Sequence, residues 1–473
     1  MHLSDVEFKR LFSFSPYKDM KIPLSEMSFS KDLVNDTRGD LYPVIFKDEK
    51  CKESVSDNQY HVSGRVGRMF CQFFPYGSYS ATIDIAAGEA GFLFKLPSCE
   101  ASVTLSRKSV IFKSTGNEES VALPSYARET VAFTVSCRPS AFDVYLSHNG
   151  GVELLHSFKC PEFSDSNLHS VFSEGYAALC VNGECTVKNV GSFIDNGVSL
   201  ADMRTVRYEN GEVMVENGRI YFTASVRLEE GTYQGVFSWL PGTMDIKMTG
   251  AVFYDAGDDR WCSDVAASLL YHREWDKWLL WVCSFSHGHI LAHAEFEGDI
   301  RFGVNVVDVE LMKLTDDNTN AELFLGFSGD EDPDFFYSRE EKKWYMSVCR
   351  LQPGTKKYRY VFFKSDSPFE NYECIGMGNE GEETGGSFVH LNGERYFVCG
   401  NSFKAVSDYR IYDAHGMKKA SFNFPDGGFR GWGTVIPLKM GTRTRLFWLT
   451  FDRHRGSSYN WSYGNVYCFE GYM

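Results

Sequence analysis

The sequence predicts an all-β chain in which an N-terminal β-sandwich, lectin-like or of jelly-roll type, precedes a five-bladed β-propeller. Three observations support this fold class. Short alternating apolar runs separated by glycine and asparagine turns fill the first part of the chain, with almost no helical periodicity. In the second part, an acidic or basic residue followed by two apolar strands recurs at a spacing of about fifty residues, as in propeller blades. Aromatic residues make up 15% of the chain, and they pack well in sheets.

The propeller repeat is clearest in the acidic segment 329–338 and the apolar strand 343–349 that follows it. Five copies are present, and they begin at Asp202, Asp264, Asp332, Glu383 and Arg430. The predicted blades end near residues 240, 310, 376, 422 and 473. Because the last blade shows only three strands, we expect residues 187–193 to supply its fourth strand and close the ring, so that no sheet edge stays open.

The first part of the chain does not follow this repeat. Its strands end at typical hairpin turns such as Asn149-Gly150 and Asn182-Gly183. We therefore predict two domains, a sandwich over residues 1–195 and a propeller over residues 196–473. The sandwich either supports the propeller or binds a glycan, and the sequence favours support because no aromatic cluster stands out in it.

Composition excludes several classes of function. The net charge is −15 and no basic block is present, which argues against a nucleic-acid partner and against docking on anionic membranes. The N-terminus lacks the apolar core of a signal peptide. The thirteen cysteines show no metal-binding spacing, and Cys283, Cys349 and Cys399 occupy matching places in three repeats. We expect buried thiols and a cytoplasmic protein, or a secreted or periplasmic one whose signal peptide has been removed. The oligomeric state is not predicted.

The propeller repeat predicts where catalytic and substrate-binding residues would lie. The first strand of each blade lines the central channel, so residues just before it converge on one funnel, and residues after the second strand surround that funnel. Carboxylates that share such a place cannot all ionise freely, because repulsion and burial separate their pKa values. Glycosidic cleavage needs that separation, since one carboxylic acid protonates the leaving oxygen while another carboxylate acts as base or nucleophile.

These carboxylates resemble a known pattern. Asp264, Asp332 in Glu-Asp-Pro-Asp-Phe-Phe, and Glu383 in Glu-Glu-Thr-Gly-Gly are similar to the three carboxylates of the five-bladed furanosidase superfamily, which includes glycoside hydrolase families 43 and 32. The resemblance covers residues 200–473. It implies that Asp264 is the base or nucleophile, Asp332 the orienting residue and Glu383 the acid. The family usually begins its series on the first blade, so Asp202 is an alternative base.

Other funnel residues are candidates for substrate binding. They are polar, charged or aromatic and lie near strand ends or on glycine-bordered loops: Asp202, Arg204, His287, His289, Arg350, Arg430, Trp432, Asp452, Arg453 and Trp461. For any single aspartate a turn-capping role is the simpler reading, and the tryptophans could equally be core residues. His287 and His289 could bind a metal, but no further ligands are evident, so neither metal nor cofactor is predicted.

The sequence therefore predicts a glycoside hydrolase acting on a polysaccharide or oligosaccharide through carboxylate acid/base chemistry. Two alternatives remain open. The funnel could hold a glycan without cutting it, or the protein could be a polysaccharide lyase that uses His289 and Arg430 at a uronate.

Overall fold

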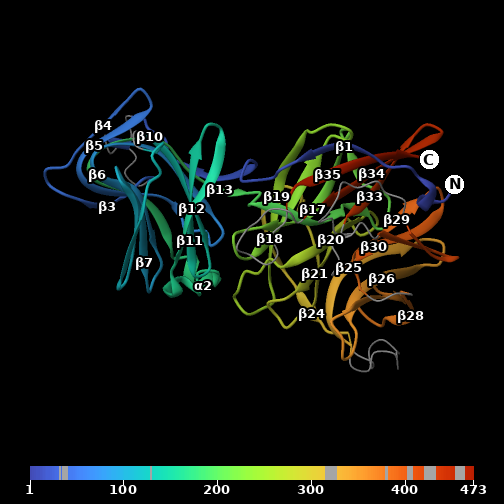
Figure 1. Cartoon of the computed structure of the whole chain (residues 1–473). Helices are drawn as coiled ribbons and strands as arrows, with labels where there is room; N and C mark the ends of the chain where they lie inside the picture. The colour runs from blue at the N-terminus through green and yellow to red at the C-terminus, as the bar shows by residue number, and fades with distance from the viewer. Residues whose placement is uncertain are drawn as a thin grey trace. The chain divides into compact units, whose positions relative to one another are not determined.

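The computed structural model of the 473-residue chain describes residues 1–30, 33–34, 41–127, 130–314, 327–378, 382–401, 409–419, 433–452 and 464–473 (Figure 1). The helical elements with described bounds are η1 (Leu3–Asp5), η2 (Pro161–Phe163) and α2 (His169–Phe172). In the described part of the chain, no helix is long and apolar enough to cross a membrane. The chain divides into two compact units, of which one comprises Met1–Met20, Asn196–Asp258 and Cys262–Met473, and the other Lys21–Asp195 and Asp259–Trp261.

The second unit is the β-sandwich. Its twelve strands are β2 (Lys21–Glu26), β3 (Val44–Lys47), β4 (Lys52–Ser56), β5 (Gln59–Gln72), β6 (Ser78–Lys95), β7 (Glu100–Ser106), β8 (Ser109–Ser114), β9 (Asn117–Ala122), β10 (Thr130–Arg138), β11 (Ala141–His148), β12 (Gly151–Lys159) and β13 (Tyr176–Asp195). The long strand β6 pairs with β10 along its first half and with β7 along its second half. It thereby belongs to both layers.

Aromatic rings from the two layers of the sandwich face each other. Phe112 on β8 stacks on Phe158 of β12 at a centroid distance of 5.2 Å, and Phe94 on β6 stacks on Phe142 of β11 at 5.1 Å. All four rings are fully or almost fully buried. Gly183 lets β13 pass close to β6, because a side-chain carbon at that position would lie 2.1 Å from the carbonyl oxygen of Ala87. The sandwich core is therefore built from stacked phenylalanines.

The first unit is a propeller of five sheets, which confirms the predicted fold class. The first blade contains β14 (Ser199–Thr205), β16 (Val215–Glu216), β17 (Arg219–Arg227), β18 (Thr232–Trp239), β19 (Ile246–Asp255) and β23 (Gly303–Asp308). The second contains β15 (Arg207–Tyr208), β20 (Val265–His272), β21 (Lys277–Ser284), β22 (Ile290–Phe296) and β24 (Glu310–Met312). The third contains β25 (Ser328–Ser338), β26 (Lys343–Leu351), β27 (Tyr358–Ser365) and β28 (Glu373–Met377).

The fourth and fifth blades have four strands each. The fourth contains β29 (Glu383–Leu391), β30 (Glu394–Asn401), β31 (Tyr409–Asp413) and β32 (Gly416–Lys419). The fifth contains β33 (Thr434–Met440), β34 (Arg443–Phe451), β35 (Val466–Tyr472) and β1 (Lys9–Phe14). The first blade ends later in the sequence than predicted, because its strands β19 and β23 lie beyond residue 240.

The strand that closes the ring is β1, and the prediction that residues 187–193 do so is wrong. Those residues belong to β13, whose two edges already pair with β6 and with β5 and β2 inside the sandwich. The N-terminal β1 instead pairs antiparallel with β35, beside which it lies in Figure 1. Residues 1–20 therefore belong to the propeller unit, and the predicted sandwich range of 1–195 is too long at its N-terminal end.

Buried thiols are common in both units, as the sequence predicted. All thirteen cysteines carry thiols rather than disulfides. Cys283, Cys349 and Cys399 are fully buried on the second strands of three consecutive blades. They act as small apolar residues between neighbouring sheets.

The segment before β1 should contribute strongly to propeller stability. Phe8 is buried, and its ring meets that of Trp448 edge-to-face at 5.5 Å. We expect Phe8→Ala to destabilise the propeller by roughly 3–5 kcal/mol, because it leaves a cavity in a closed core. Urea unfolding followed by tryptophan fluorescence would measure this. Phe8→Leu, which keeps most of the apolar volume, should cost much less, and equal midpoints for wild type and Phe8→Ala would contradict the docking of this segment.

Candidate active site

The inner strands of the five blades form a closed ring. Each contacts the next around the circle, and the last contacts the first: β14, β20, β25, β29 and β33. Thr205 at the end of β14 and Thr434 at the start of β33 share a hydrogen bond of 2.8 Å between their hydroxyl groups, which joins the first blade to the fifth. Side chains at corresponding positions of these strands are thereby brought to one central region.

A β-bulge repeats in the inner strand of the first four blades. The pairing register shifts between Ala201 and Arg204, Val265 and Ser268, Glu331 and Asp334, and Thr384 and Ser387. One residue in each bulge has a left-handed backbone: Asp202 (φ 52°), Ala266 (φ 58°), Asp332 (φ 50°) and Gly385 (φ 64°). An extra residue at this point bends the strand and redirects the side chains around it.

The bulge shows which carboxylates are structurally equivalent. Asp202 and Asp332 both occupy the left-handed bulge position. Asp264 and Glu383 both lie two residues before that position in their own blades, as does Asp330. The sequence repeat aligned Asp202, Asp264, Asp332 and Glu383 as one column, whereas the structure divides them between two columns.

Asp332 connects three blades. Its Oδ2 atom accepts hydrogen bonds from the hydroxyl of Thr384 at 2.6 Å and from the backbone amide of Gly385 at 2.8 Å, both on β29. Its Oδ1 atom lies 3.8 Å from Nη2 of Arg204 on β14. Asp332 is thus held by the fourth blade on one oxygen and faces a cation of the first blade with the other.

Arg204 is the most unusual cation of the site. Its side chain is only 2% exposed, yet none of its three guanidinium nitrogens has a hydrogen-bond partner among the described residues. The neighbouring charges of Asp332, Asp334 and Asp202 raise its pKa despite its burial. A buried guanidinium that keeps its charge but lacks acceptors is suited to bind an oxygen-rich ligand.

Glu383, at the start of β29, is the most deeply buried of the predicted carboxylates, with no exposed surface. Burial raises the pKa of this carboxyl, although Tyr412, the backbone amide of Tyr360 and Arg410 partly oppose the effect. The Tyr412 hydroxyl donates to Oε1, and Nη1 of Arg410 lies 3.4 Å from the same oxygen. A carboxyl group in this setting retains its proton to higher pH than an exposed glutamate does.

Asp202 differs from Asp264 in its contacts. Asp202 is buried and pairs with Nη2 of Arg227 at 3.0 Å. Burial raises the pKa of the Asp202 carboxyl, Arg227 opposes that rise, and the nearby charge of Asp332 adds to it. Asp202 and Asp332 are therefore electrostatically linked across two blades.

Asp264 is saturated with hydrogen-bond donors. The hydroxyls of Tyr254 and Ser284 both donate to its Oδ2 atom, the latter at 3.2 Å. The backbone amide of Ser286 donates to Oδ2 at 3.2 Å, and its hydroxyl donates to Oδ1 at 3.1 Å. These contacts bind Asp264 to the loop after β21, where it organises the local structure.

Asp334 has a connecting role that the sequence did not reveal. This fully buried carboxylate on β25 accepts hydrogen bonds from Arg207, from the hydroxyl of Ser268 at 2.9 Å and from the amide of Phe388 at 2.6 Å. Arg207 also donates to the carbonyl oxygen of Phe388 at 3.0 Å. The only sequence signal was the Asp-x-Asp spacing after Asp330, which places alternate carboxylates on one side of a strand.

The two histidines lie on the loop after β21 but contact different partners. Nδ1 of His287 is 2.8 Å from the Ser284 hydroxyl, and Nε2 of His289 is 2.6 Å from Oε1 of Glu331. Within the described ranges, no group of three or more histidine, cysteine, aspartate or glutamate side chains is arranged to hold a metal ion.

The remaining predicted site residues have mixed outcomes. Arg350 is buried and pairs through Nε with Asp330 at 2.6 Å. Asp452 is buried and accepts hydrogen bonds from the amide of Asn465 at 2.9 Å and from the hydroxyl of Tyr467 at 2.6 Å. Both therefore have structural partners. Four predicted residues lie outside the described residues: Arg430, Trp432, Arg453 and Trp461.

Comparisons with known proteins agree on the fold. No protein-family model and no curated protein matches the chain. Among solved structures it is similar to the carbohydrate binding module CBM66 from Bacillus subtilis, at 12% identity over 32% of this chain and 95% of that one, with a TM-score of 0.24. It is also similar to an exo-beta-1,3-galactanase from Clostridium thermocellum, at 10% identity over 56% of this chain and 62% of that one, with a TM-score of 0.39.

A third solved structure of similar fold is an endo-1,4-beta-xylanase from Bacteroides thetaiotaomicron. The identity is 14% over 58% of this chain and 90% of that one, and the TM-score is 0.38. The five-bladed propeller that the resemblance implied is confirmed by the arrangement of the sheets. At these identities the likenesses concern the fold alone.

The Asp334 carboxylate should be essential for propeller stability. We expect Asp334→Asn to destabilise the propeller by roughly 3–5 kcal/mol, because it leaves the buried Arg207 charge uncompensated. Asp366→Asn is a suitable control, since Asp366 pairs at the surface with Lys343 at 2.7 Å with a side chain 82% exposed. Such a pair contributes at most about 1 kcal/mol. Equal unfolding midpoints for the two variants in urea would contradict the connecting role of Asp334.

Proposed function

We propose that the protein is a glycoside hydrolase that cleaves a polysaccharide or oligosaccharide at the centre of the propeller. The observation that carries this proposal is the cluster formed by Asp202, Asp332 and Glu383. These three buried carboxyl groups come from three blades: Asp332 lies 3.8 Å from the Arg204 guanidinium, the charge of Asp202 acts on both Asp332 and Arg204, and Glu383 directly precedes Thr384, whose hydroxyl is bonded to Asp332. Carboxyl groups with different environments are what acid/base cleavage of a glycosidic bond requires.

Glu383 is the proposed general acid. Its complete burial and raised pKa favour the protonated form, which can donate to a departing sugar oxygen. Tyr412 and Arg410 fix the orientation of the carboxyl group. The Thr384 hydroxyl beside Glu383 is bonded to Asp332, which supports a role for Asp332 in orienting the acid and the bound sugar.

Asp202 is the proposed base or nucleophile in place of Asp264. A base needs an accessible oxygen that accepts few hydrogen bonds, and Asp264 accepts three on Oδ2 and a fourth on Oδ1. Arg227 favours the ionised form of Asp202, while burial raises its pKa and so strengthens it as a base. Its shared bulge position and electrostatic coupling with Asp332 support the same assignment.

Leaving-group chemistry tests the acid. Glu383→Gln should lower turnover by about 10²–10⁴-fold on aryl glycosides with poor leaving groups, and far less on dinitrophenyl glycosides, which depart without protonation. In the wild type, activity should fall as pH rises through the raised pKa of Glu383, because the acid loses its proton. In Glu383→Gln this alkaline limb should disappear. An equal loss on both substrate types would remove Glu383 as the acid.

A pair of matched variants tests the base. Asp202→Asn should abolish most turnover on every aryl glycoside, whereas Asp264→Asn should act through stability and leave kcat within a few-fold of the wild type. Steady-state kinetics together with thermal unfolding of each variant would separate the two effects. The opposite result, with kcat lost in Asp264→Asn and kept in Asp202→Asn, would reverse the assignment.

The complete burial of Glu383 also fits a second function, in which the propeller holds a glycan without cutting it. A screen of aryl glycosides and polysaccharides distinguishes the two. Saturable binding without any released sugar would favour this second function.

A further inference from the structure

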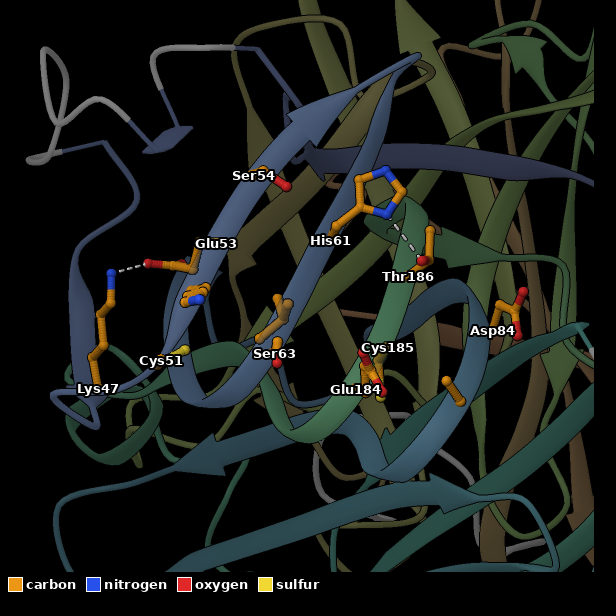
Figure 2. Close-up of a pocket in the computed structure, with 13 residues that line it drawn as sticks. Lys47, Cys51, Glu53, Ser54, His61, Ser63, Asp84, Glu184, Cys185 and Thr186 are labelled. Carbon is orange, nitrogen blue, oxygen red and sulfur yellow. Dashed lines mark hydrogen bonds and ion pairs between the residues drawn. The ribbon is translucent and has the colours of Figure 1, made fainter.

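The β-sandwich has a cavity of its own, with a volume of about 830 Å³ (Figure 2). It lies over four neighbouring strands, in the order β4, β5, β13 and β6. Its size is within the range of roughly 300–1,000 Å³ that is typical of small-molecule sites. Apart from the glycan-binding alternative for the sandwich as a whole, nothing in the sequence pointed to this surface.

A row of polar side chains crosses all four strands in register. Ser54 pairs with His61, His61 with Thr186, and Thr186 with Asp84. Residues directly opposite each other in antiparallel strands carry their side chains on the same face. Nδ1 of His61 is 3.0 Å from the Thr186 hydroxyl, the contact drawn as a dashed line in Figure 2, and its Nε2 is 3.0 Å from the hydroxyl of Ser56. The row therefore forms a continuous hydrogen-bonding surface.

A second polar row runs beside the first. Lys52 pairs with Ser63, and Ser63 pairs with Glu184. All three residues are exposed, whereas the alternating neighbours Val62 and Cys185 are buried beneath them. The polar face is thus supported by the hydrophobic core of the sandwich.

One wall of the cavity is fixed by Glu53, whose side chain is only 1% exposed. Nζ of Lys47 lies 2.5 Å from this carboxylate and Nε of Arg68 lies 2.7 Å from it, and the Tyr60 hydroxyl also donates to it. Burial alone would raise the pKa of Glu53, but the hydrogen bonds from Arg68, Lys47 and Tyr60 lower it to about 2. The wall is therefore rigid, and its charge is already compensated.

The lining indicates the chemical class of the ligand. Two lysines and three carboxylates line the cavity, and one of those carboxylates, Glu53, is compensated by Arg68 and Lys47. Counted together with Arg68, the two lysines balance the three carboxylates, so neither an anion nor a cation is strongly favoured. Among the described residues that line the cavity none is Phe, Tyr or Trp, which disfavours a flat apolar ligand. Closely spaced donors and acceptors without net charge suit a neutral molecule with many hydroxyl groups.

We propose that this face of the sandwich is a binding site for a neutral saccharide, whose hydroxyl groups form hydrogen bonds with Thr186, Asp84 and Glu184 instead of stacking on aromatic rings. The site is separate from the carboxylate cluster of the propeller. It would hold a glycan whether or not the propeller cleaves one.

Affinity gel electrophoresis of the full-length chain tests the site. Glu383→Gln serves as the parent, so that a bound glycan is not consumed, and the gels contain xylan, arabinan, galactan or, as an acidic probe, polygalacturonate. At least one neutral polysaccharide should retard the parent. Asp84→Ala and Glu184→Ala should each weaken that retardation roughly tenfold or more, because each removes a carboxylate that accepts hydrogen bonds from the sugar hydroxyls.

Two controls make the result specific. Glu118→Ala removes an exposed carboxylate from β9 of the same unit and should leave retardation unchanged. Adding Asp332→Asn to the parent shows how much of the retardation comes from glycan binding by the propeller. Equal retardation of Asp84→Ala and the parent, retardation by polygalacturonate alone, or loss of all retardation in Asp332→Asn would each overturn the proposal. Because no turnover is measured, failure of the proposed hydrolase activity would not affect this outcome.

Discussion

The left-handed bulge in the inner strands is the constraint on which the centre of the propeller depends. A regular strand would send alternate side chains to opposite faces of its blade. The extra residue interrupts that alternation, and the equivalent bulges of four neighbouring strands do so at one level of the ring. Aspartate tolerates a positive φ better than branched residues do, and glycine does so freely. The bulge position can therefore carry a carboxylate in the first and third blades.

Burying several carboxylates close together costs free energy. Cations and hydrogen-bond donors from neighbouring blades offset that cost. Asp334 receives its cation from Arg207 of the second blade, and its other donors from the second and fourth blades. Asp332 faces Arg204 of the first blade. Because these partners come from blades other than the third, the two buried carboxylates are compensated only when neighbouring blades pack together.

The sequence predicted the fold well because alternation and the fifty-residue repeat are local patterns. It could not identify β1 as the closing strand, since six residues far from the repeat carry no sign of their partner β35. It also could not separate Asp202 and Asp332 from Asp264 and Glu383. The left-handed bulge position has no obligatory residue type, since Asp202, Ala266, Asp332 and Gly385 occupy it in the four blades, so an alignment by acidic residues combined positions that are two residues apart. The polar row of the sandwich was missed because it exists only in cross-strand register.

The proposed division of roles among the propeller carboxylates rests on the number of hydrogen-bond donors around each carboxylate and on whether a charged group is among those donors. Asp264 accepts hydrogen bonds from four neutral donors, three of them on Oδ2, which tie it to its own surroundings. Glu383 has a tyrosine hydroxyl, an arginine at 3.4 Å and no exposed surface, and burial prevails in raising its pKa. Asp202 meets an arginine directly. Residue type alone would make the three interchangeable. Burial raises the pKa of both Glu383 and Asp202, and the direct pairing of Asp202 with Arg227 is the difference on which the proposed roles of acid and base rest.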